Sequence, residues 1–75
     1  MPETTTQLDV RGMNCPLPIL KTRQAVNRLR SGEVLEVTST DPGSMKDIAA
    51  FCEQTGHELL LSREATDGYV FLIRK

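Results

Sequence analysis

One short segment, Cys15-Pro16-Leu17-Pro18, places a thiol and two prolines between a predicted strand and a predicted helix. Proline is tolerated in the first turn of a helix, where backbone amides lack partners within the helix. The prolines therefore fix a helix start beside Cys15. Because a helix N-terminus favours negative charge, we expect the Cys15 thiol to have a pKa below its free value of about 8.5. A thiolate attacks electrophilic sulfur and can carry sulfur as a persulfide, so Cys15 is a candidate reactive thiol.

The position of Cys15 also allows a purely structural role. Free cysteines are among the most buried residues, so Cys15 could instead pack beneath the helix start. The two prolines leave the amides of Leu17 and Ile19 to face a charge at this terminus. Cys52 differs, because it falls on the apolar face of a second predicted helix, and we expect it in the core.

Residues after the cysteine are candidates for docking a partner. Leu17 and Leu20 lie off the predicted buried face of the helix and predict an exposed apolar patch, unless strand ends or the N-terminal tail cover them. Lys21 and Arg23 flank the same helix start. They are candidates for contacting an acidic partner, although solvated lysines and arginines are the commoner outcome.

Two further charged residues have a functional and a structural interpretation. Arg11 is a candidate to tune Cys15, or it forms a surface ion pair with Asp9. Asp41 is a candidate docking residue, or it caps the turn before Pro42, which is the usual role of aspartate in such a loop.

Length and composition limit the classes of protein. The 75 residues suffice for one small domain, which we place at residues 1–75. No apolar run approaches the roughly 20 residues of a membrane span, and no signal segment is evident, so we expect a cytoplasmic protein with no membrane partner. Two cysteines and one histidine supply too few ligands for a closed zinc site unless a carboxylate or a second chain joins them, so we expect no metal and no cofactor.

The charge is unevenly distributed along the chain. Residues 10–32 hold five basic residues and no acid, a local charge of +5 within a chain of net charge −1. Such polarity can steer one face toward an acidic partner, whereas the balanced total and only three aromatic residues argue against direct nucleic-acid binding.

Periodicity predicts the elements that position these residues. Alternation predicts strands at residues 7–11, 34–40, 59–62 and 69–74, the last two joined through a turn at Asp67-Gly68. Spacings of three and four predict a helix over 16–30. A second helix starts at a capping-box-like Ser44 and Asp47, buries Met45, Ala49 and other apolar residues, and ends at Gly56. The order βαβαββ predicts an α/β protein of the α+β type, a two-layer sandwich with two helices on one face of a four-stranded sheet.

The sequence of the chain also resembles that of a known family. The runs LDVRGMNCPLPILKTRQAV, EVLEVTSTDPGSMKDI and FLIRK resemble the TusA (SirA-like) family of small sulfur carrier proteins over nearly the whole chain. The most specific part is Cys15-Pro16-x-Pro18 after Asp9-x-Arg11-Gly12.

The resemblance implies a mixed sheet in the order 1-2-4-3 and a single TusA-like sulfur carrier domain. It implies that Cys15 accepts sulfane sulfur as a persulfide from a cysteine desulfurase or a rhodanese-type sulfurtransferase. The sulfur would pass to an acceptor protein in tRNA thiolation, molybdenum-cofactor biosynthesis or dissimilatory sulfur oxidation. We expect a monomer that relays sulfur between proteins rather than a full turnover enzyme.

Two other functions stay open. One is a non-catalytic binding or regulatory module, with contact to RNA or the ribosome suggested by analogy of fold alone. The other is a thiol redox protein, which would normally use a resolving cysteine, whereas Cys52 lies 37 positions from Cys15 on a predicted buried face.

Overall fold

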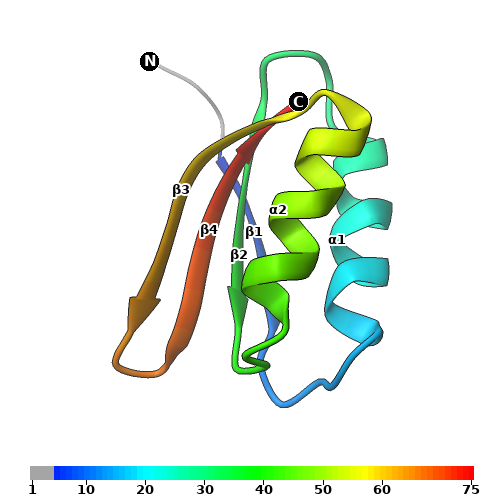
Figure 1. Cartoon of the computed structure of the whole chain (residues 1–75). Helices are drawn as coiled ribbons and strands as arrows, with labels where there is room; N and C mark the ends of the chain where they lie inside the picture. Colours follow the sequence, from blue (N-terminus) through cyan, green and yellow to red (C-terminus); the bar gives the residue numbers. More distant parts are fainter. Residues whose placement is uncertain (1–4) are drawn as a thin grey trace.

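A computed structural model describes residues 5–75 of the chain (Figure 1). Six elements follow one another in the predicted order. They are β1 (Thr5–Val10), α1 (Leu17–Arg28), β2 (Val34–Ser39), α2 (Ser44–Thr55), β3 (Glu58–Ala65) and β4 (Gly68–Arg74). Neither helix in this part of the chain is long and apolar enough to cross a membrane.

The four strands form one mixed sheet in the order β1-β2-β4-β3. β1 and β2 are parallel, whereas β4 pairs antiparallel with both β2 and β3. Both helices lie on one face of this sheet, with α1 against β1 and β2 and α2 against β3 and β4. The two-layer arrangement and the strand order that the sequence and the resemblance implied are therefore confirmed.

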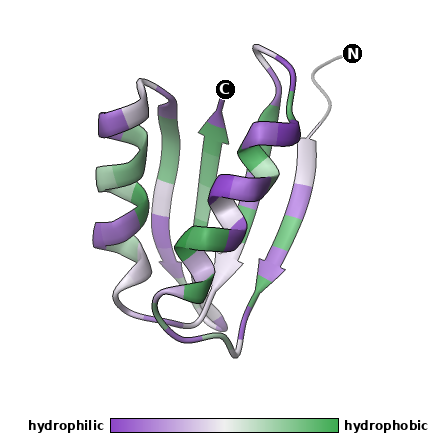
Figure 2. Ribbon diagram, turned by 90° about the vertical axis from the view of Figure 1, so that its right-hand side faces the viewer, coloured by the Kyte–Doolittle hydropathy of each residue, from purple (hydrophilic) through white to green (hydrophobic). Residues whose placement is uncertain are grey.

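The core fills the space between the helices and the sheet. Apolar residues lie along the strands and on the sides of the helices toward the sheet, as the hydropathy colouring shows (Figure 2). The buried cluster consists of Val10, Val26, Leu29, Leu35, Val37, Ile48, Phe51, Cys52, Phe71 and Ile73. The burial of Cys52 was predicted and is confirmed.

The buried face of α2 is rotated from the predicted one. Met45 and Ala49 are exposed, whereas Phe51 is buried beside Cys52. The spacing of apolar residues fits both faces, because residues three and four apart share a side of a helix in either case. Phe51 has the larger apolar area, so its burial excludes more surface from water.

The predicted capping box at the start of α2 is wrong. Gly43 is the N-cap and makes no side-chain cap bond, while Ser44 is already the first helical residue. The Ser44 hydroxyl instead shares a buried hydrogen bond of 2.6 Å with the hydroxyl of Ser39 at the end of β2. Tertiary packing thus uses the serine to join helix and sheet, and Asp47 is left free for another contact.

Other boundaries differ by a few residues. α1 is shorter than the predicted 16–30, and Pro16 and Leu29 are its N-cap and C-cap. β2 ends one residue earlier than predicted, whereas β3 extends beyond the predicted 59–62 in both directions. Ala65 pairs with Gly68, so Thr66 and Asp67 form the hairpin loop in place of the expected Asp67-Gly68. Pairing with β4 extends β3 through polar residues that sequence alternation alone did not assign to a strand.

Candidate functional site

Two helix starts meet at one edge of the molecule. Because β1 and β2 are parallel and each is followed by a helix, α1 and α2 both begin at the carboxyl edge of these strands (Figure 1). Cys15 lies in the connection between β1 and α1, and Asp47 lies in the first turn of α2. The fold therefore brings together residues 32 positions apart in the sequence.

Cys15 is exposed and adjoins a helix start that contains both predicted prolines. Pro16 is the N-cap of α1, the Cys15–Pro16 peptide bond is cis, and Pro18 is buried in the first turn. The Leu17 amide donates to the carbonyl oxygen of Asn14 at 2.9 Å, so it is not available to Cys15 as the sequence had suggested. The alternative that Cys15 packs beneath the helix is excluded by its exposure.

The Cys15 thiol donates a hydrogen bond to Asp47 across the two helix starts. Its Sγ lies 3.8 Å from Asp47 Oδ2. The pKa of Cys15 is raised, firstly because the sulfur is partly shielded from water and secondly because the Asp47 and Asp41 carboxylates disfavour a second negative charge. The expectation of a lowered pKa is therefore wrong. Shielding of the sulfur from water and the two carboxylates together raise the pKa, at a helix start where Pro16 and Pro18 have no amide proton and the Leu17 amide is already bonded.

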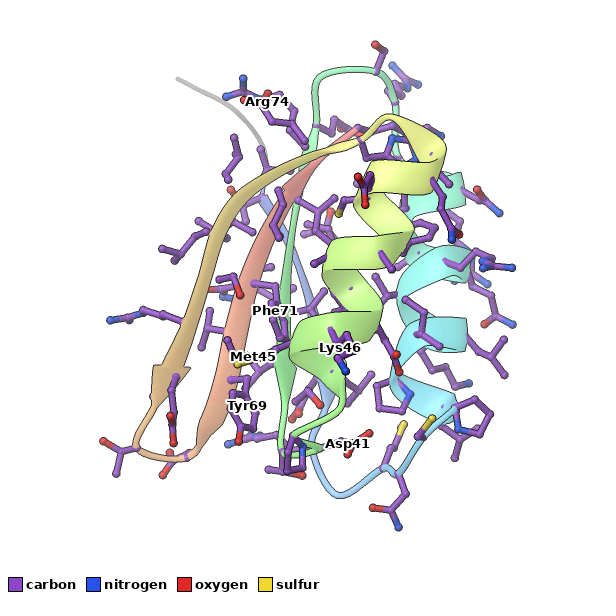
Figure 3. All side chains as sticks on the ribbon, in the orientation of Figure 1. Asp41, Met45, Lys46, Tyr69, Phe71 and Arg74 are labelled. Carbon is purple, nitrogen blue, oxygen red and sulfur yellow. The ribbon has the colours of Figure 1, made fainter. Side chains whose placement is uncertain are left out.

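Asp41 caps the turn that leads into α2. Its Oδ1 accepts a hydrogen bond from the Gly43 amide at 3.2 Å, and its carbonyl oxygen accepts one from the Ser44 amide at 3.0 Å. Among residues 5–75, Asp41 Oδ2 is the buried side-chain oxygen without a hydrogen-bond partner. Figure 3 shows Asp41 at the same edge of the molecule as the first turn of α2. Its capping role agrees with the structural interpretation.

An open groove of about 220 Å³ extends from Cys15 along α1 and α2. Its lining residues combine an apolar floor with a few polar side chains, namely Cys15, Pro16, Ile19, Arg23, Asp47, Ala50, Phe51 and Gln54. The Arg23 guanidinium lies over the Phe51 ring, 5.7 Å from its centroid, in a cation–π contact. Arg23 is therefore held over the groove rather than fully solvated.

The predicted docking residues of α1 lie on its solvent side. Leu17 and Leu20 are 47% and 45% exposed, so no strand end within residues 5–75 buries them. Lys21 and Arg23 are exposed on the same helix. The apolar patch and Lys21 thus lie on the helix that follows Cys15, and Arg23 lines the same groove as Cys15, although this geometry alone assigns them no partner.

The Arg11 side chain forms an ion pair with Asp9. Its Nε and Nη2 each donate to the Asp9 carboxylate at 3.0 Å, and its backbone amide bonds the same side chain. This pairing raises the pKa of Arg11 and lowers that of Asp9, with the side-chain hydrogen bond as the main cause in each case. The groups that shift the pKa of Cys15 are the aspartates Asp47 and Asp41, so the geometry favours the surface ion pair for Arg11.

Sequence reasoning missed Asp47 and Phe51 as members of this site. Asp47 was assigned to a capping box, and Phe51 was not considered. A usable signal was present, because the ends of two parallel strands lie at the same edge of a sheet and the helices that follow them must start together. This places the loop around Cys15 beside the first turn of α2.

Comparisons with known proteins agree with the fold and with the family resemblance. The family model described as Sulfurtransferase TusA matches residues 6–75. The chain is 49% identical over 75 residues to a sulfur carrier protein TusA of Allochromatium vinosum, covering 100% of this chain and 99% of the relative. It is 45% identical over 74 residues to a putative sulfur carrier protein of Halobacterium salinarum, covering 97% and 91% of the two chains.

A crystal structure of a SirA-like protein from Desulfitobacterium hafniense has the same fold. It matches with a TM-score of 0.76 and 19% identity over 95% of each chain. The chain belongs to the TusA family of small sulfur carrier proteins.

Proposed function

We propose that this protein carries sulfane sulfur as a persulfide on Cys15. The observation that carries the proposal is the difference between the two thiols of a chain from a sulfur carrier family. Cys15 is exposed at the mouth of a groove, whereas Cys52 is buried in the core. Only Cys15 can approach the sulfur of a second protein without unfolding.

The transfer needs no oxidant. The Cys15 sulfur bonds to the outer sulfur of a donor persulfide, the donor's own S–S bond breaks, and the donor cysteine leaves with that electron pair. The proton of the Cys15 thiol passes to the departing donor sulfur. An acceptor cysteine then takes the outer sulfur from Cys15 in the same way, which restores the Cys15 thiol.

The partners that we propose are proteins with a reactive cysteine. The donor is a cysteine desulfurase or a rhodanese-type sulfurtransferase, and the acceptor serves tRNA thiolation, molybdenum-cofactor biosynthesis or sulfur oxidation. We propose that the chain acts in the cytoplasm as a monomer. The exposed Leu17 and Leu20 supply apolar area to such a complex, while Lys21 and Arg23 favour an acidic rim on the partner.

Intact-mass measurement after incubation with a persulfide donor tests this function. The protein should gain one sulfur atom, about 32 Da, and lose it on reduction. Cys15→Ser should abolish the gain, and the matched variant Cys52→Ser should retain it. Uptake by folded Cys15→Ser, or none by the native protein, would refute the proposal and favour a binding module.

A further inference from the structure

The contact between Cys15 and Asp47 depends on the state of the sulfur. An ionised carboxylate only accepts hydrogen bonds, so the 3.8 Å contact requires a proton on Cys15 Sγ. A thiolate at the same place would face the carboxylate with no proton between them, and the two charges would repel. The hydrogen bond therefore forms only with the protonated thiol, which is the state of Cys15 in the empty carrier, the protein without bound sulfur.

The charged groups around the sulfur come from three parts of the fold. Asp47 belongs to α2, Asp41 belongs to the turn before it, and both raise the pKa of Cys15. Arg23 of α1 lines the same groove, but its guanidinium is held over Phe51. Negative charge thus directly adjoins Cys15, and the groove's cation lies over its apolar floor.

We propose that Asp47 is a positioning residue for Cys15: its carboxylate accepts the thiol hydrogen bond, holds the sulfur at the mouth of the groove and keeps the empty carrier protonated until a partner docks. This inference rests on the proposed function for its biological meaning. Its effect on the thiol is measurable without any sulfur donor.

This arrangement makes the empty carrier selective. A protonated thiol reacts slowly with small electrophiles and oxidants, because the thiolate is the nucleophile. A docked donor that places a cation against Asp47 relieves the repulsion, and its leaving sulfur takes up the thiol proton. Sulfur then passes only within a complex, and the empty thiol is protected from side reactions.

The test is the rate of alkylation of native Cys15 by iodoacetamide from neutral to alkaline pH. Asp47→Asn keeps the shape of the side chain and removes its charge. It should raise the rate at neutral pH about threefold or more and move the profile to lower pH. Asp47→Glu, which restores a carboxylate, should return the profile toward that of the native protein.

Glu53→Gln is the matched control, because Glu53 is an exposed acid on another side of α2. It changes the net charge equally and should leave the profile unchanged. An Asp47→Asn profile that superimposes on the native one, or an equal shift in Glu53→Gln, would overturn the role of Asp47. Thermal unfolding of each variant confirms that the folded protein is being compared.

Failure of this inference and failure of the proposed function are distinguishable. Normal sulfur uptake with an unshifted Asp47→Asn profile would overturn the positioning role and support the carrier. A shifted profile without sulfur uptake by the native protein would support the effect of Asp47 on the thiol and refute the carrier function.

Discussion

The two thiols of this chain lie in different surroundings, one at an exposed edge of the molecule and one in the core. The pKa of each is raised, that of Cys15 by partial shielding and two aspartates and that of Cys52 by burial alone. Cys15 is exposed at a groove between the two helix starts, whereas Cys52 is 3% exposed in a cluster with Ile48 and Phe51. Accessibility, and not an activated thiolate, therefore separates a reactive position from a structural one in this fold.

Alkylation of the native protein should show the largest difference between the two regions. Cys52 can react only when the structure opens, so we expect it to be labelled about a thousandfold or more slowly than Cys15. Peptide mapping after a short exposure to iodoacetamide measures both sites in one sample. The unfolded protein is the control, because both thiols should then react at similar rates. Faster labelling of Cys52 in the native protein would contradict the comparison.

Leucine truncation compares the same two regions by stability. Leu35→Ala in β2 should lower the free energy of unfolding by about 2–5 kcal/mol, because Leu35 is fully buried. Leu20→Ala should change it by no more than about 0.5 kcal/mol, because Leu20 is 45% exposed. Urea denaturation measures both values.

Leu20→Ala should also speed dissociation from a sulfur donor, because it removes apolar contact area from the proposed docking surface. Binding kinetics with the donor test this. A core-like loss of stability in Leu20→Ala with unchanged transfer by the folded fraction would show that Leu20 belongs to the core and not to a docking surface.

The smallest expected effect is on the pH dependence of stability. Folding raises the pKa of both thiols, so the folded protein keeps their protons to a higher pH than the unfolded chain. The free energy of unfolding should therefore fall as pH rises above the free thiol value of about 8.5. Cys52→Ser should reduce this fall by the contribution of the Cys52 thiol, and Cys15→Ser should reduce it by the contribution of the Cys15 thiol. Urea denaturation from neutral to alkaline pH measures the slopes, and identical slopes in all three proteins would contradict the prediction.

Sequence patterns determined the order of elements and the place of Cys15 at a helix start. These features are local, because alternation, helical spacing and the conformational limits of proline and glycine act over a few residues. The termination of α2 at Gly56, which has a φ of 79°, is such a case. The resemblance to the TusA family supplied the strand order that periodicity alone does not give.

Tertiary structure decided the contacts of the site. Asp47 adjoins Cys15 because β1 and β2 are parallel, so that the helices that follow them start at the same edge of the sheet. The pKa of Cys15 is raised firstly by shielding of its sulfur from water and secondly by the carboxylates that the fold places beside it. A helix start viewed alone favours a thiolate, whereas two carboxylates from a distant segment disfavour it. Electrostatic effects depend on distances in space, and the sequence by itself specifies those distances only between near neighbours along the chain.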